Sequence, residues 1–383
     1  MLPYLITFLA SCSLLALAPK VKYKSIGIAL TIVALLLPCV LAAIRSTSTG
    51  TDTRVYAKPL FDKAMAADNF SEYISSGWSV GWGIKWVRNF EIGFSSLIYW
   101  IAKLFGEFPA VLFSIQILIS APLYLGLKQY PALKNKLWLP FAIYYLLFFN
   151  LGLNAMRQMI GVSIVFYGIS IVLNHDKRDF TFVVLIILAA LFHKTSLMGL
   201  LLYAILKLIK YGEVSKDKKN SQRKIVKILL IFSLIGALIL ISNRTLLLGL
   251  INYFGFNEYS GYIVKNAGIG IQLLSRLPVA FLLIFNVKSM RKNDKWQMTS
   301  FLFTTLAIDL LVASLSVAST YASRIGYLFQ FFYIVALSNL CLIDENSKRQ
   351  HRNELLALTY GVIYWVFMYG YMGVGQTVPY LIG

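Results

Sequence analysis

Charged side chains are scarce in this sequence: only 14% of the 383 residues are Asp, Glu, Lys or Arg, while 58% are apolar. A soluble globular domain carries about 25% charged residues. One core of this size cannot hide so many apolar side chains from water, so we infer that lipid surrounds the chain. The apolar runs also lack the strict alternation of outer-membrane strands, which predicts an all-α, polytopic membrane protein.

Cysteine and histidine are equally rare, with three residues of each. The cysteines lie singly inside apolar runs and the histidines fall on both predicted faces of the membrane, so neither a disulfide framework nor a metal site is expected. The chain contains no HExxH motif, no glycine-rich P-loop and no GxSxG motif. These absences exclude the commonest protease, ATPase and hydrolase types, and we expect no cofactor.

Basic residues are abundant but unevenly placed, and the net charge of +20 lies mainly in the loops between thirteen apolar runs. The positive-inside rule assigns these loops to the cytoplasm, which removes the argument for a nucleic-acid partner. All the basic loops fall on one side only if one run does not cross. The run 92–105 has 14 residues, too few for a hydrocarbon core of about 30 Å. We therefore predict a short re-entrant or interfacial helix there and about 12 membrane-spanning helices in a single domain, 1–383.

Two long segments, 45–107 and 242–271, then lie on the outer face. The first holds six of the sixteen acidic residues and is expected to contain interfacial helices. Its tryptophans Trp78, Trp82 and Trp86 are spaced by four, which predicts that they share one helical face. They are typical of an interfacial aromatic belt, and a platform for stacking sugar rings is the alternative.

Four arginines stand at the outer ends of apolar runs, against the usual charge bias: Arg45, Arg157, Arg276 and Arg324. The guanidinium fork matches phosphate oxygens and keeps its charge, so four together indicate an anionic ligand. Snorkelling to headgroups or pairing with an acidic residue is the alternative for each. Asp309 is the one carboxylate deep in an apolar run, and it indicates a proton relay or an ion pair with a partner such as Arg276.

Four short motifs follow one another in the first half of the chain. They are RSTSTGTDTRVY from Arg45 to Tyr56, EIGF from Glu91, NAMRQ from Asn154 to Gln158, and FHKTS from Phe192 to Ser196. In this order and spacing they resemble the EpsG family of bacterial exopolysaccharide and capsule proteins, which is related to Wzy-type O-antigen and capsular polysaccharide polymerases. The pair Lys194-Thr195 departs from the smaller or more variable residues expected there. Beyond residue 200 the resemblance rests on hydropathy and on arginines such as Arg324.

The resemblance implies a multi-pass protein of the bacterial cytoplasmic membrane with an outward-facing active site, and a GT-C-like helix arrangement is one architecture for it. It implies a polymerase that joins oligosaccharide repeat units carried on undecaprenyl pyrophosphate, with a flippase and a chain-length regulator of the same pathway as partners. The candidate bases are Asp52, Glu91 and His193, of which Asp52 is the first choice. The residues expected to bind sugar or pyrophosphate are Arg45, Tyr56, Asn154, Arg157, Gln158, Arg276 and Arg324.

Alternatives stay open at this point. Asp52 or Glu91 is a structural partner for Arg45 or Arg157 if the carboxylate only holds an arginine in place. A flippase or transporter of lipid-linked oligosaccharide predicts ionisable residues along a central path and an internal repeat. Asp309 is the one residue that fits the first expectation, and the sequence shows no internal repeat. A membrane O-acyltransferase would use His193 as its base.

Overall fold

The computed structural model describes residues 1–81, 83–175, 177–213, 270–293, 296–315, 320–342 and 347–383. These residues form two compact units, one comprising 1–198 and 355–383 and the other 199–354. The predicted run 226–241 and nearly all of the predicted segment 242–271 lie outside the described residues.

Apolar helices of 5 to 20 residues dominate the first unit. They are α1 (Leu2–Leu17), α2 (Lys24–Ala43), α6 (Phe108–Leu127), α7 (Trp138–Tyr144), α8 (Asn150–Asn154), α9 (Met156–Asn174) and α10 (Asp179–Ala190). Helix α6 packs against both α2 and α9, while α9 also packs against α10 and α1 packs on α2 and α7. Nearly every residue of α9 is buried, so this helix forms the centre of the unit.

Seven helical segments in the described part of the chain are long and apolar enough to cross a membrane: Leu2–Lys20, Lys24–Ala43, Phe108–Leu127, Met156–Asn174, Ile271–Met290, Trp296–Ser314 and Arg324–Leu342. They confirm the predicted helical membrane protein. The count of about 12 crossings and the GT-C-like arrangement stay predictions. Helix α5 (Ile92–Phe105) has the 14 residues expected for the short run and is shorter than these seven.

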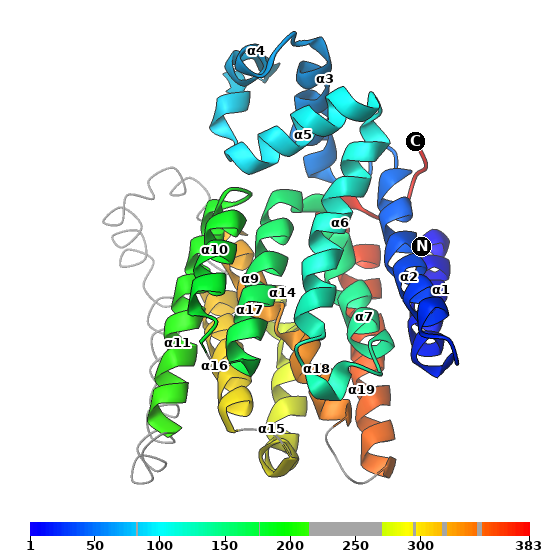
Figure 1. Cartoon of the computed structure of the whole chain (residues 1–383), viewed down its shortest axis with the longest axis vertical. Helices are drawn as coiled ribbons and strands as arrows, with labels where there is room; N and C mark the ends of the chain where they lie inside the picture. The colour runs from blue at the N-terminus through cyan, green and yellow to red at the C-terminus, as the bar shows by residue number, and fades with distance from the viewer. Residues whose placement is uncertain (82, 176, 214–269, 294–295, 316–319, 343–346) are drawn as a thin grey trace. The chain divides into compact units, whose positions relative to one another are not determined.

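The segment between α2 and α6 folds into small elements beyond one end of the long helices of its unit (Figure 1). It contains α3 (Lys58–Ala66), α4 (Phe70–Ser75) and α5, and α5 packs on both α3 and α6. Asn69 caps α4 by accepting the backbone N–H of Glu72 at 3.0 Å, and Lys103 of α5 donates to the Ala67 carbonyl just beyond α3 at 2.6 Å. Through these contacts, the segment 45–107 is folded into packed short elements rather than an extended loop.

The predicted helical face of tryptophans is wrong. Trp78 lies in strand β1 (Gly77–Val80) and Trp86 in strand β2 (Gly83–Trp86), which pair as an antiparallel hairpin, and Trp82 lies outside the described residues. Three glycines within ten residues oppose a helix, and Gly81 adopts a positive φ of 57° in the turn. The register pairs Trp78 with Lys85, so these two side chains share one face of the hairpin while Trp86 projects from the other.

The end of the chain packs against its beginning within the first unit. The Tyr4 hydroxyl donates to the Thr377 carbonyl at 2.6 Å, and the Asn150 amide donates to the Thr377 hydroxyl at 2.9 Å. The Trp365 indole in turn donates to the Asn150 amide oxygen at 2.7 Å. A single bridge pairs Arg45 with Ile382, so the segment that opens the first motif is held by the last residues of the chain.

The second unit contains α11 (Gly199–Glu213), α14 (Ile271–Leu274), α15 (Leu277–Asn293), α16 (Trp296–Leu315), α17 (Thr320–Gln330) and α18 (Tyr333–Leu342). Helix α16 packs against α11 and α17, while α15 packs against α18. Two runs that the sequence presents as continuous are each divided in two, between α14 and α15 and between α17 and α18. Helix α19 (Ser347–Trp365) leads from this unit back into the first.

Close backbone approach at Gly93 joins the start of α5 to the end of α10, and it supplies a test of the fold. The Gly93 N–H donates to the Leu191 carbonyl at 2.9 Å, and an added Cβ would lie 2.7 Å from that oxygen. We expect Gly93→Ala to lower the free energy of unfolding by about 1–3 kcal/mol, because backbone must move to admit the methyl group. Thermal unfolding in detergent measures this as a lower Tm. Gly83→Ala is the control, since its Cβ would meet no atom within 4 Å; equal Tm values for both variants would contradict the close approach.

Candidate functional site

The four motifs come together within the first unit, each at the end of a different helix. The first lies after α2, the second at the start of α5, the third at the junction of α8 and α9, and the fourth in the turn after α10. Hydrogen bonds join the first to the third and the second to both the third and the fourth. Tertiary structure therefore assembles one polar cluster in which residues as far as 111 positions apart are hydrogen-bonded.

A break in the helix places the third motif in this cluster. Ala155 has φ −82° and ψ 50°, which interrupts the helical path between α8 and α9. The Asn154 side-chain oxygen accepts from the Thr51 hydroxyl at 2.7 Å and from the Asp52 backbone N–H at 3.1 Å. The Asn154 amide oxygen thus holds the backbone that carries Asp52, and its expected role in orienting sugars stays a prediction.

Arg157 lies one residue into α9 and pairs with the carboxylate of Glu91. The two side chains are only 22% and 10% exposed, so the pair is largely withdrawn from solvent. The other Glu91 oxygen accepts the Lys194 backbone N–H at 3.3 Å. Both oxygens of Glu91 are thus engaged, which is the arrangement of a carboxylate that orients an arginine, the structural alternative raised by the sequence.

Two aromatic rings complete the surroundings of Arg157. Its guanidinium carbon lies 4.9 Å from the ring centroid of Tyr56 and 4.9 Å from that of Phe90. Cation–π contacts of this kind hold a guanidinium in place without using its hydrogen-bond donors. The Arg157 Nε is buried and has no hydrogen-bond partner in the described part of the chain. The arginine therefore keeps donor capacity for a ligand.

Asp52 is linked to the arginine through Tyr56. The Tyr56 hydroxyl donates to Asp52 Oδ2 at 2.7 Å, and the Tyr56 side chain is buried. Burial first, and then the neighbouring Asp52 carboxylate, raises the pKa of Tyr56 well above its ordinary value. The phenol therefore stays protonated and donates its hydrogen bond to the Asp52 carboxylate.

His193 is held by its own turn. Its Nδ1 accepts the Thr195 backbone N–H at 3.3 Å and lies 2.7 Å from the Thr195 hydroxyl, which in turn lies 3.5 Å from the Gln158 amide nitrogen. A ring nitrogen that accepts an N–H carries no proton, so the neutral imidazole has its proton on Nε2. In this tautomer Nδ1 is an acceptor and the proton lies on Nε2, which argues against the expected role of His193 as the base.

Arg45 is almost fully buried, at 4% exposure, rather than facing an open site. Its Nη2 donates to the Leu153 carbonyl at 3.1 Å and to the Thr53 hydroxyl at 3.2 Å. Burial lowers the pKa of Arg45 to about 10. Arg45 thus joins the first motif to the helix break, and its expected role in binding pyrophosphate stays a prediction.

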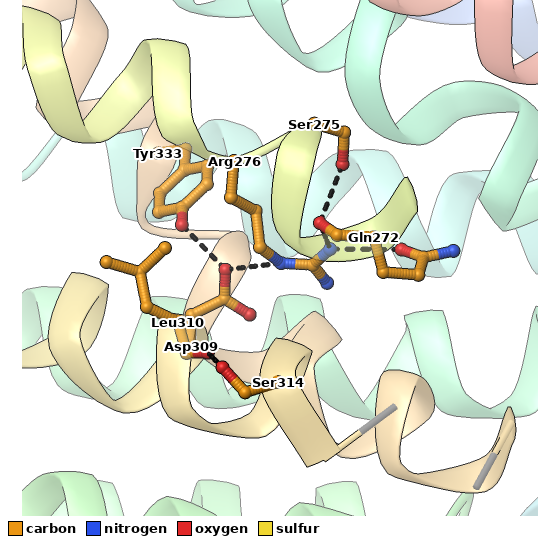
Figure 2. Close-up of polar contacts among 7 residues, drawn as sticks. All are labelled: Gln272, Ser275, Arg276, Asp309, Leu310, Ser314 and Tyr333. Carbon is orange, nitrogen blue, oxygen red and sulfur yellow. Dashed lines mark hydrogen bonds and ion pairs between the residues drawn. The ribbon is translucent and has the colours of Figure 1, made fainter. Parts of the chain in front are cut away.

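Arg276 and Arg324 belong to the second unit. Arg276 Nε donates to Asp309 Oδ2 at 2.8 Å, and the Tyr333 hydroxyl donates to the same oxygen at 2.6 Å (Figure 2). Arg276 also donates to the carbonyl and side-chain oxygens of Gln272. The ion-pair alternative for Asp309 is thus the observed arrangement. Arg324 is exposed on α17, and a single site containing all four arginines stays a prediction.

Sequence reasoning missed Lys85, Phe90 and Thr195. The Lys85 Nζ lies 5.6 Å from the centroid of the Phe90 ring, the same ring that Arg157 contacts. Only the strand register brings Lys85 there, and no spacing in the sequence signals it. As for metals, within the described ranges no three His, Cys, Asp or Glu side chains gather closely enough to hold an ion.

With this geometry established, comparison with known proteins identifies the family. The sequence model of the EpsG family matches residues 28–382, nearly the whole chain. The chain belongs to the EpsG family. No curated protein and no solved structure matches it. The resemblance noted from the four motifs is confirmed, and EpsG membership indicates a membrane protein of polysaccharide biosynthesis and points to a glycosyltransferase-like polymerase.

The Arg157–Glu91 pair of this EpsG protein gives a direct stability test. Glu91→Gln keeps the side-chain shape but leaves the enclosed guanidinium without its anion, so we expect the free energy of unfolding to fall by about 1–3 kcal/mol. Thermal unfolding of the purified protein measures the change. Asp62→Asn is the matched control, because its pair with Lys58 is exposed on both sides and should contribute at most about 1 kcal/mol. Equal losses in the two variants would show that the Arg157–Glu91 pair is no more enclosed than a surface pair.

Proposed function

We propose that this EpsG protein is a Wzy-like polysaccharide polymerase. It joins oligosaccharide repeat units carried on undecaprenyl pyrophosphate at the outer face of the bacterial cytoplasmic membrane. The observation that carries the proposal is the Arg157 guanidinium, oriented by Glu91, beside the Asp52–Tyr56 pair. An enclosed arginine and a carboxylate held by a tyrosine are the two groups that glycosyl transfer from a pyrophosphate requires.

Arg157 binds the pyrophosphate in this reaction. When the glycosidic bond to the pyrophosphate breaks, its electron pair leaves with the phosphate oxygen, where negative charge develops. A guanidinium already fixed by Glu91 and two aromatic rings stabilises that charge without reorganising. The buried Nε supports this role, because it has no other partner among the described residues.

Asp52 is the general base. It removes the proton from the acceptor hydroxyl as the new carbon–oxygen bond forms at the anomeric carbon, while the growing chain moves to the next lipid-linked unit. Asn154 and Arg45 fix the backbone around Asp52, and both are positioning residues. His193 is not assigned the role of the base, since its Nδ1 already accepts a backbone N–H.

The energy for the reaction is already present in the glycosyl pyrophosphate bond, so the protein needs no nucleotide site. Its substrate and its solvent are both lipids, and the flippase that delivers the repeat unit and a chain-length regulator are its expected partners. Tyr56 contacts both Asp52 and Arg157, and Gln158 follows Arg157 on α9; these two are the proposed sugar-orienting residues. Arg276 is assigned to its ion pair with Asp309 instead.

The competing functions find less support. A transporter would use Asp309 as an intramembrane relay, but this carboxylate accepts from both Arg276 and Tyr333. A buried carboxylate that is already paired with an arginine is typical of a structural ion pair. An acyltransferase would need His193 as its base, and the Nδ1 contact with the Thr195 N–H opposes that role.

Polymer formation by the purified protein tests the proposal. With the lipid-linked repeat unit of its own host and no nucleotide, wild type should produce a ladder of products on a gel. Arg157→Ala should lower the rate about 10²–10³-fold through lost charge stabilisation. Asp52→Asn should lower it about 10²–10⁴-fold while binding is retained.

Lys58→Ala is the control, because Lys58 lies on α3 and pairs with Asp62 away from these residues. Its ladder should match that of wild type. Absence of a ladder combined with movement of the same lipid across a vesicle membrane would replace the polymerase by a flippase. A normal ladder from Arg157→Ala would refute the role of that arginine.

A further inference from the structure

The β1–β2 hairpin brings a second cation to the arginine of the site. Lys85 Nζ lies 5.6 Å from the centroid of the Phe90 ring, and Arg157 Cζ lies 4.9 Å from the same centroid. Phe90 is buried, so both cations contact a ring that belongs to the core. Two like charges around one ring are unfavourable unless an anion lies between them.

The positive charge of Lys85 has little compensation from nearby negative charge. Lys85 makes no ion pair with any described residue, and the Glu91 carboxylate pairs with Arg157. Burial first, and then the charge of Arg157, lowers the pKa of Lys85, and Asp52 opposes the shift. A lysine in this state gains binding energy when a negatively charged ligand enters beside it.

The hairpin also fixes the direction of Lys85. The register places Trp78 beside it on the same face, and Trp78 stacks on Phe90 with ring centroids 5.8 Å apart and planes 18° from parallel. This stacking attaches the hairpin to the ring that carries Arg157. Lys85 and Arg157 are therefore held near each other by tertiary structure rather than by chance exposure.

We propose that Lys85 is the second phosphate-binding cation of the site and that it makes the site select a lipid diphosphate over a lipid monophosphate. This inference rests on the proposed polymerase function and adds a specificity residue to it. Arg157 binds one phosphoryl group and Lys85 binds the other. A monophosphate reaches only one of them, so it loses the contact to Lys85.

Lys58 shows what an ordinary lysine over a ring looks like in the same chain, and it provides the matched control. Its Nζ lies 5.3 Å from the Phe61 centroid, close to the distance of Lys85 from Phe90. Lys58 differs because it pairs with Asp62 on an exposed helix. The same substitution at both positions removes the same atoms and separates the loss of a cation–π contact from the loss of a ligand contact.

The test measures binding of undecaprenyl diphosphate and undecaprenyl monophosphate to the full-length protein in detergent by native mass spectrometry. Wild type should prefer the diphosphate. Lys85→Met should weaken diphosphate binding about tenfold and leave monophosphate binding within about twofold, which abolishes the preference. Lys85→Arg should keep the preference, and Lys58→Met should leave both affinities unchanged.

An unchanged preference in Lys85→Met would overturn the inference, and so would an equal loss for both lipids. In either case a normal polymer ladder from wild type, absent in Arg157→Ala, would leave the proposed function standing. If wild type binds neither lipid and forms no ladder, the proposed function fails together with the role of Lys85.

Discussion

A helix that breaks inside a lipid-surrounded unit releases backbone groups that lipid cannot satisfy, so the protein must supply their partners. In this chain the break is at Ala155, and the carbonyl released just before it, that of Leu153, accepts from the buried guanidinium of Arg45. Gly50 approaches the same carbonyl, with an added Cβ only 3.0 Å from its oxygen and with a φ of 89° that favours glycine. These contacts to the Leu153 carbonyl, together with the bonds of Asn154 to Thr51 and Asp52, join the first and third motifs.

The residues on either side of the break at Ala155 belong to the candidate site. Asn154, the last residue of α8, accepts from the segment that carries Asp52. Arg157, near the first turn of α9, is left at the helix end, where it meets Glu91 and the rings of Tyr56 and Phe90. In an unbroken helix, Asn154 and Arg157 would point in directions fixed by the regular helical repeat. The break instead gathers them at one end of the unit.

The buried arginines of the chain illustrate two ways to hold a cation away from water. Arg276 is neutralised by Asp309, with Tyr333 donating to the same carboxylate oxygen. Arg45 donates mainly to uncharged oxygens, and burial lowers its pKa. The sequence presents both as arginines at the ends of apolar runs. Only their neighbours, which lie far away in sequence, make one an ion-pair partner and the other a support for a backbone break.

The sequence by itself determined the lipid environment, the helical class, the 14-residue length of α5 and the family, because hydrophobic run length and short motifs are local properties. It also named Asp52, Glu91, Arg157 and His193. Tertiary structure alone decided which carboxylate orients the arginine, which nitrogen of His193 accepts, and that Lys85 joins them. Those outcomes depend on strand register and on contacts between residues tens of positions apart. The tryptophan spacing misled for the same reason, since glycines and cross-strand pairing outweighed the helical period.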